Sequence, residues 1–224
     1  MLKTFKHRGS SGDILYALPC VIGSGGGKIN IVKKQHYELL KSLLKLQPNI
    51  DVTHEWQGIS LDEYRKDKNI HRKHLAQCHL DALNVSFDLT QAWLFNIDPI
   101  TVAPIVVNRT NHYHDKNEID WALLEEYSSQ LLFIGFEDEF AVFKKRFVPS
   151  AARYRKCKDA LEMACLIKGS KLFIGNQSLA FALAEAMKHP RVLEICYKYD
   201  NCRPQGANGY IYLTKELIEK CLSM

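Results

Sequence analysis

The feature that most limits the fold of this chain is a regular alternation of short β-rich runs with segments of helical periodicity. The predicted strands, which are rich in β-branched and aromatic residues, span residues 2–7, 28–34, 50–56, 103–110, 131–136, 171–176 and 191–197. The predicted helices, which have apolar residues three and four positions apart, span residues 13–23, 37–47, 69–84, 118–130, 137–147, 158–170, 178–188 and 214–222. This order predicts an α/β protein with parallel strands covered by helices.

The alternation pauses once, in a connector that ends at Pro99. We therefore predict two Rossmann-like domains, residues 1–100 and 101–224, whose parallel sheets face a cleft. Ligands of open parallel sheets bind beyond the carboxyl ends of the strands, where helix N-termini point. The turns to examine are "RGSSGD", "NRTNHYHDK", "GFEDE" and "GNQS".

Composition narrows the class of protein. A length of 224 residues suffices for a substantial core, and a net charge of +5 is too small for a nucleic-acid-binding surface. The seven cysteines form no CxxC pair, which is typical of reduced thiols in a cytoplasmic protein. No run approaches the ~18 apolar residues of a transmembrane helix, although peripheral membrane contact stays open.

Three tempting motifs are set aside. "GSGGGK" at 23–28 is followed by Ile29 and a predicted strand, so its glycines are expected to end a helix rather than bind phosphate. "HRKHLAQCH" at 71–79 lacks a second ligand pair and is predicted to be a solvated basic helix face. "NHYHD" at 111–115 is expected to be a polar loop at the cleft rim. No metal site is predicted.

The turn after the first strand is a stronger candidate. Gly9, Ser10, Ser11 and Gly12 lead into a helix whose first turn carries Asp13. Such a turn leaves backbone N–H groups free for a phosphate or a substrate group. The helix dipole also favours an acidic residue there. The sequence alone supports two interpretations of Asp13 equally, a catalytic residue and a residue that starts the helix.

A second candidate follows the predicted strand at 171–176. Gly175, Asn176, Gln177 and Ser178 form a polar turn at a helix start, which suits an anion. Glu185, within that apolar helix, is either a hydrogen-bond acceptor for a ribose or sugar hydroxyl or a solvent-facing residue.

Arg109 comes directly after the strand at 103–110. Its planar guanidinium suits a phosphate or a carboxylate. The other reading is an ordinary surface arginine.

"GSSGDILYALPCV" resembles the N-terminal motif of glycosyltransferase family 9, the ADP-heptose:lipopolysaccharide heptosyltransferase group of bacteria. "LEMACLIKGSKLFIGNQSLAFALAEAMKHPRVLEI" resembles the late segment of the same family. The resemblance implies a GT-B fold. The chain departs from the family in the late turn, which reads Gln177-Ser178-Leu179 in place of Asp-Thr/Ser-Gly, and at Ala182, where the family has His.

The resemblance also implies roles. Asp13 would be the general base that deprotonates the acceptor hydroxyl, and Gly9 to Gly12 would shape the acceptor side. Ser178 and nearby N–H groups would hold the donor diphosphate, and Arg109 or Lys116 would neutralise the leaving group. The expected donor is a nucleotide-sugar, and the acceptor a glycan, a lipid-linked group or a protein. No cofactor or metal is expected, because helix N-termini and basic residues stabilise the leaving diphosphate.

Two alternatives remain. One is a catalytically silent nucleotide-sugar-binding protein of the same fold, favoured by the altered late turn. The other is a relative of the sugar-nucleotide epimerases, suggested by Ser178 and Glu185.

Overall fold

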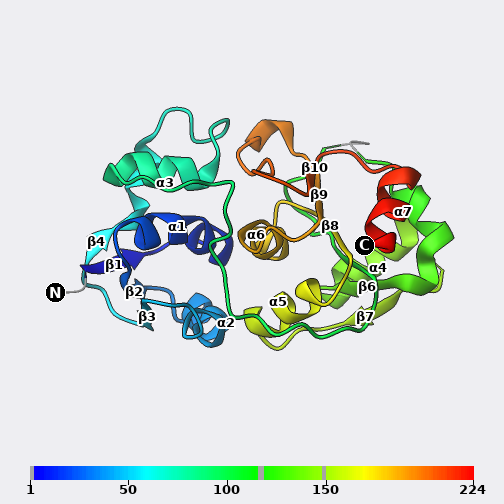
Figure 1. Ribbon diagram of the computed structural model, residues 1–224, viewed down its shortest axis with the longest axis horizontal. Helices are drawn as coiled ribbons and strands as arrows, with labels where there is room; N and C mark the ends of the chain where they lie inside the picture. The colour runs from blue at the N-terminus through cyan, green and yellow to red at the C-terminus, as the bar shows by residue number, and fades with distance from the viewer. Residues whose placement is uncertain (1–2, 116–118, 148–149) are drawn as a thin grey trace.

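The computed structural model describes residues 3–115, 119–147 and 150–224, and it contains two parallel β-sheets that lie next to each other along the long axis of the molecule (Figure 1). Every strand pair in both sheets is parallel across these described residues. The predicted α/β class is therefore confirmed.

The first sheet has the strand order β3-β2-β1-β4. Its strands are β1 (Lys3–His7), β2 (Gly27–Ile31), β3 (Ile50–Thr53) and β4 (Ile59–Ser60). The associated helices are α1 (Ser11–Gly23), α2 (Lys34–Leu44), α3 (Leu75–Leu83) and the 3₁₀ helix η1 (Leu61–Lys66). Between α1 and β2, Gly25 and Gly26 adopt φ values of +91° and +88°, which confirms that these glycines turn the chain after the first helix.

The second sheet has the order β10-β9-β8-β5-β6-β7. Its strands are β5 (Ile105–Asn108), β6 (Leu131–Ile134), β7 (Arg153–Arg155), β8 (Leu172–Asn176), β9 (Arg191–Glu194) and β10 (Gly209–Tyr210). The helices of this half are α4 (Glu137–Phe147), α5 (Ala160–Lys168), α6 (Leu179–Ala186) and α7 (Lys215–Ser223), together with the 3₁₀ helices η2 (Trp121–Gln130) and η3 (Tyr197–Tyr199). Central strands β5 and β8 are buried throughout, as strands covered on both faces must be.

Alternate residues of the second sheet point to its two faces and belong to two different hydrophobic cores. Ile105, Val107 and Ile174 face α4, α7 and η2, where Trp121 packs edge-on against Phe143 at 5.3 Å between ring centroids. Val106 and Phe173 face the opposite way and join α5 and α6. In Figure 1, α4 and α7 accordingly lie beyond the sheet from the first half of the chain, whereas α5 and α6 lie between the two sheets.

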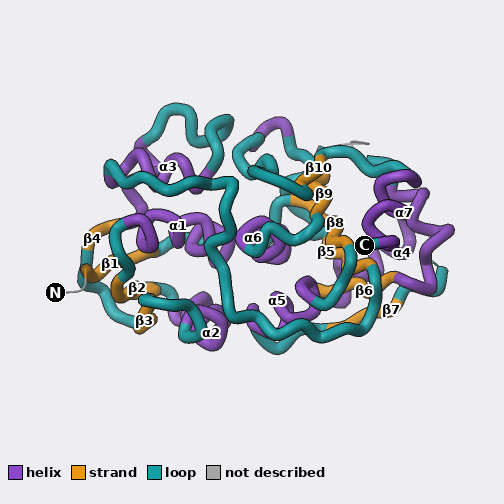
Figure 2. The backbone as a smooth tube through the Cα atoms, in the orientation of Figure 1, coloured by secondary structure: helices purple, strands orange, loops and turns teal. Residues whose placement is uncertain are grey.

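The two halves share one apolar core. Helix α1 packs directly against α6, and α2 packs against α5 (Figures 1 and 2). The connector after α3 runs across this junction, and its Trp93 is fully buried there. Trp93 donates its indole N–H to the carbonyl of Leu15 in α1 at 3.1 Å and its backbone N–H to the carbonyl of Ala186 in α6 at 2.9 Å. Division into domains 1–100 and 101–224 stays a prediction.

Two element predictions need correction. The helix expected over residues 69–84 begins only at Leu75, because the preceding segment folds into turns. The solvated basic face is also wrong for His74 and His79, since both imidazoles are buried. The helix expected over residues 118–130 is a 3₁₀ helix from Trp121, with Lys116 to Glu118 outside the described residues. Strands β4, β7 and β10 were not predicted at all.

Candidate functional site

The start of α1 carries Asp13 in a capping box. The Ser10 hydroxyl accepts the Asp13 N–H at 3.3 Å, and the Asp13 carboxylate accepts the Ser10 N–H at 3.2 Å. Asp13 is therefore the helix starter that the sequence allowed. Its side chain still reaches solvent, so the same carboxylate is accessible to a ligand.

A basic side chain from a distant segment meets Asp13. Arg65 of η1 donates from Nη2 to Asp13 Oδ2 at 2.9 Å, and its Nε lies 3.7 Å from Asp62 Oδ1. The neighbouring Tyr64 ring lies under the Arg65 guanidinium, 4.8 Å from it. Burial raises the pKa of Tyr64, and the negative charge of Asp13 adds to the effect. No local pattern predicts that Arg65 meets Asp13, because 52 residues separate the two.

The turn residues before Asp13 are held tightly. A Cβ on Gly9 would lie 2.7 Å from Asp13 Oδ2 and 2.7 Å from Arg65 Nη2. Ser11 is buried, and its hydroxyl lies 2.9 Å from Nδ1 of His36. The amides of Ser11 and Gly12 have no acceptor among the described residues, as expected for the first turn of a helix. These two amides, rather than those of the whole turn, are free to meet a ligand.

The two predicted turns come together. The carbonyl oxygen of Ser178 lies 4.0 Å from the position that a Cβ on Gly12 would take, so the N-terminus of α1 faces the N-terminus of α6. Ser178 caps α6, and its hydroxyl accepts the Phe181 N–H at 3.2 Å. Both residues lie where the helix N-termini present unpaired donors.

The remaining residues of the second turn build its support. Gly175 allows β8 to approach β5, because a Cβ there would lie 2.6 Å from the carbonyl oxygen of Asn108. Asn176 accepts the Thr110 N–H at 2.9 Å and donates to the Thr110 carbonyl at 3.1 Å, which fixes the loop after β5. Gln177 donates to the carbonyl of Tyr199 at 2.6 Å.

Two side chains that were predicted to bind the donor instead form buried ion pairs within the protein. Arg109 is buried and makes a two-pronged ion pair with Glu194, at 2.7 Å from Nε and 3.0 Å from Nη2. Glu185 is fully buried, and its carboxylate binds Arg191, Lys188 and the backbone N–H of Gln205. Neither side chain is free to meet a diphosphate or a sugar hydroxyl, so we leave both out of the proposal. Lys116 lies outside the described residues.

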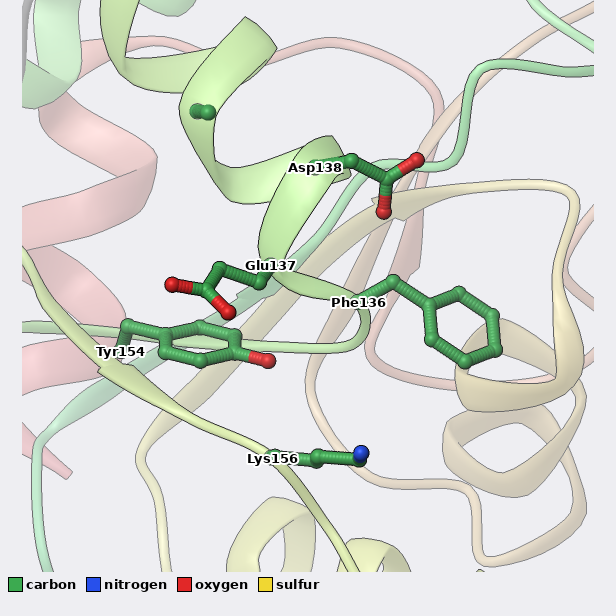
Figure 3. Close-up of a pocket in the computed structure, with 6 residues that line it drawn as sticks. Phe136, Glu137, Asp138, Tyr154 and Lys156 are labelled. Carbon is green, nitrogen blue, oxygen red and sulfur yellow. The ribbon is translucent and has the colours of Figure 1, made fainter.

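A hollow of about 530 Å³ opens beyond the carboxyl ends of β6 and β7. It is lined by Phe136, Glu137, Asp138, Ala141, Tyr154 and Lys156. The side chains of Phe136, just before α4, and Glu137, its first residue, point in different directions. Tyr154 and Lys156 line the other side of the hollow (Figure 3). Phe136 is 65% exposed, and an apolar side chain exposed at a hollow is typical of a binding site. The "GFEDE" turn was a predicted place to look, but the three-residue strand β7 gave no signal for Tyr154 and Lys156.

Three further observations concern metal ligands, membrane-spanning helices and cysteines. Within residues 3–115, 119–147 and 150–224, no three His, Cys, Asp or Glu side chains are grouped so that they could hold a metal ion. Over the same residues, no helix is both long and apolar enough to cross a bilayer. All seven cysteines are free thiols.

The fold defines the class of architecture. Two parallel sheets of four and six strands, packed through helices with both candidate turns at their junction, form the GT-B arrangement found in heptosyltransferases. No protein-family model and no curated protein sequence matches the chain.

Solved structures do match over most of the chain. A glycosyl transferase family 9 protein from Veillonella parvula aligns with 99% of this chain and 89% of its own, at 13% identity and a TM-score of 0.59. ADP-heptose lipopolysaccharide heptosyltransferase II of E. coli aligns with 99% of this chain and 98% of its own, at 10% identity and 0.58. The iron-containing dodecameric glycosyltransferase TibC of enterotoxigenic E. coli aligns with 96% of this chain and 65% of its own, at 15% identity and 0.62. These similarities establish the shared fold.

Proposed function

We propose that the protein transfers a sugar from a nucleotide-diphosphate donor to an acceptor hydroxyl. The observation that carries this proposal is the meeting of the α1 and α6 N-termini at Gly12 and Ser178, with Asp13 in the first turn of α1. One side of this junction supplies a carboxylate and the other supplies anion-binding amides. Those are the two groups that such a transfer requires.

In the proposed reaction, the Asp13 carboxylate takes the proton of the acceptor hydroxyl. The acceptor oxygen then forms a bond to the anomeric carbon of the donor, and the bond from that carbon to the diphosphate oxygen breaks. The diphosphate leaves with the electron pair and is stabilised by the Ser178 hydroxyl and the N-terminal amides of α6. Because the helix terminus supplies this positive potential, the scheme needs no metal ion.

The hollow at β6 and β7 suits the nucleoside end of the donor. It offers the exposed side chain of Phe136 to a base and the carboxylates of Glu137 and Asp138 to ribose hydroxyls. Strands β8, β5, β6 and β7 are consecutive neighbours in the sheet, so two to three spacings of about 4.8 Å separate the Ser178 turn from this hollow. An extended nucleoside diphosphate can bridge that span.

The first experiment measures donor binding by calorimetry with ADP, UDP, GDP, CDP and dTDP. We expect one nucleotide to bind, and we expect Phe136→Ala to raise its dissociation constant by roughly 5- to 150-fold, since base–aromatic stacking contributes about 1–3 kcal/mol. Tyr212→Ala removes another aromatic side chain that is more than half exposed but does not line the hollow, and it should leave the dissociation constant unchanged. Equal effects of both variants would contradict the placement of the base.

The second experiment separates transfer from binding. Asp13→Asn should bind the nucleotide as the wild type does and lose roughly 10²- to 10⁴-fold in kcat, the usual contribution of a general base. Asp98→Asn changes an exposed carboxylate in the connector and serves as the control. Wild-type kcat in Asp13→Asn would exclude Asp13 as the base.

A catalytically silent nucleotide-sugar-binding protein is the second candidate. The observation in its favour is that Arg65 already neutralises Asp13, with 2.9 Å between the paired atoms. In that case nucleotide binding persists, but no nucleotide-sugar yields free nucleoside diphosphate with any acceptor. Because Glu185 is buried and paired, we do not carry the epimerase interpretation forward.

A further inference from the structure

His7 is the last residue of β1 and lies directly behind the turn that leads to Asp13. Its side chain is 0% exposed. Two rings surround it, with Tyr64 at 6.1 Å and His79 at 5.5 Å between ring centroids. Sequence reasoning did not single out this residue, and the proposed reaction has so far made no use of it.

One hydrogen bond defines the state of the imidazole. The Gly9 N–H donates to Nδ1 of His7 at 2.8 Å. Only an unprotonated Nδ1 can accept this bond, so the geometry assigns a neutral ring with its hydrogen on Nε2. Nε2 has no hydrogen-bond partner among the described residues, and Asp62 Oδ1 lies 3.6 Å from Nδ1. A ring protonated on Nδ1 would place two donors against each other.

The Gly9 amide is the middle one of three consecutive backbone N–H groups, each of which donates a hydrogen bond to a side chain. The Arg8 N–H donates to Asp62 Oδ2 at 3.0 Å, and the Ser10 N–H donates to Asp13 Oδ2 at 3.2 Å. The three bonds fix the path of the chain from β1 to α1. The Gly9 amide directly precedes the Ser10 amide that donates to Asp13 Oδ2, so a shift of the Gly9 backbone moves a donor of that carboxylate.

We propose that His7 is a positioning residue for the reaction: its unprotonated Nδ1 holds the Gly9 amide and thereby fixes the Asp13 carboxylate between the turn and Arg65. This inference rests on the proposed role of Asp13 as general base. His7 touches neither substrate nor reacting atoms, and it acts through the backbone of the turn.

The surroundings keep the imidazole neutral. Asp62 and Asp13 attract a positive charge on His7, whereas Arg65 and His36 oppose it, and the neutral rings of Tyr64 and His79 complete the shell. Burial outweighs the two carboxylates and lowers the pKa of His7 to about 4. At neutral pH the ring is therefore uncharged, as the hydrogen bond from the Gly9 N–H requires.

Two substitutions separate the hydrogen bond from the volume of the ring. In His7→Asn, the side-chain Oδ1 takes nearly the place of Nδ1 and accepts without titrating. His7→Leu keeps an apolar group of similar size and has no acceptor. We expect His7→Leu to lose roughly 10- to 100-fold in kcat, as misplaced catalytic groups do, with unchanged nucleotide affinity. We expect His7→Asn to stay within about threefold of wild type, because the amide stays bound.

Two measurements do not depend on activity. Long-range ¹H–¹⁵N spectra of the wild type should show Nδ1 unprotonated and Nε2 protonated. Hydrogen exchange at the Gly9 amide should be slow in the wild type and His7→Asn and fast in His7→Leu. If His7→Leu does not fold, the wild-type spectrum and the His7→Asn kcat decide the question.

Several results would overturn the inference. They are wild-type kcat in His7→Leu, a protonated Nδ1 in the wild type, or equal losses of kcat in both variants that follow their losses of thermal stability. Failure of the proposed function is distinct: Asp13→Asn would then keep its kcat. An inactive Asp13→Asn beside a fully active His7→Leu would reject the role of His7 alone.

Discussion

At the scale of single residues, Asp13 serves two purposes at once. It completes the capping box of α1 with Ser10, and it presents a carboxylate to the junction of the two halves. Arg65 holds that carboxylate through one oxygen, and the glycine at position 9 gives both groups room to meet. The geometry of the candidate base therefore depends on the absence of a side chain at position 9.

This dependence predicts a contrast between two glycines. Gly9→Ala should lower the free energy of unfolding by about 1–3 kcal/mol, because the new methyl group overlaps Asp13, Arg65 and the His7 ring. Gly12→Ala meets nothing closer than 4.0 Å and should leave stability unchanged or raise it, since alanine favours a helix. Urea unfolding of both variants tests the contrast. Equal stabilities would show that the turn is looser than described.

At the scale of secondary-structure elements, strong hydrophobic patterns predicted the fold well and weak ones did not. The strands β1, β2, β5, β8 and β9 and helix α1 lie where apolar periodicity placed them. The edge strands β4, β7 and β10 have only two or three residues each, too few to show any alternation. Helix α7 also lies where it was predicted, and Thr214 caps it, with its hydroxyl accepting the Leu217 N–H at 3.2 Å.

The candidate site was predicted only in part, for a physical reason. Local patterns identified the turns at Gly12 and Ser178, because glycine and capping residues act within a few positions. The partners of charged side chains come from distant segments, and no local pattern specifies them. Arg65 meets Asp13 and Glu194 meets Arg109 across 52 and 85 residues.

The connector between the halves is an element whose energetic role can be measured. Trp93→Ala should destabilise the protein by about 3–5 kcal/mol, because it empties a fully buried site between α1 and α6 and breaks the bond to the Leu15 carbonyl. Trp56 is 67% exposed, so Trp56→Ala is the matched control and should change stability by less than about 0.5 kcal/mol. Chemical denaturation gives both values. A small loss in Trp93→Ala would contradict the packing.

At the scale of the whole molecule, buried histidines set a pH dependence. Burial lowers the pKa of His7 and of His74 to about 4, and that of His189 to about 3. In the unfolded chain the pKa of each is near 6.5. Below that pH the unfolded state therefore binds more protons than the folded state, which lowers the free energy of unfolding. The stabilisation from these residues is complete above pH 6.5 and is lost as the pH falls toward 4.

The free energy of unfolding should therefore decline by on the order of 1.4 kcal/mol per pH unit for each of these histidines within that window. Urea titrations at pH 7.5, 6.0 and 5.0 measure the slope. Replacement of exposed His71 by Gln should not alter it. A flat profile between pH 6.5 and 5 would contradict the burial of the three imidazoles.

The apolar layer shared by α1, α6 and Trp93 has a consequence for engineering. Proteins built from self-sufficient modules tolerate chimeras, because each module carries its own core. Here the first helix of one half completes the core beneath the last crossover helix of the other. A hybrid that joins residues 1–100 to the second half of another protein should leave Ile14, Leu15 and Leu18 against a surface with different side chains. Grafts that exchange only the turns at the junction preserve that core, and they are the route by which the specificity of this scaffold can be redesigned.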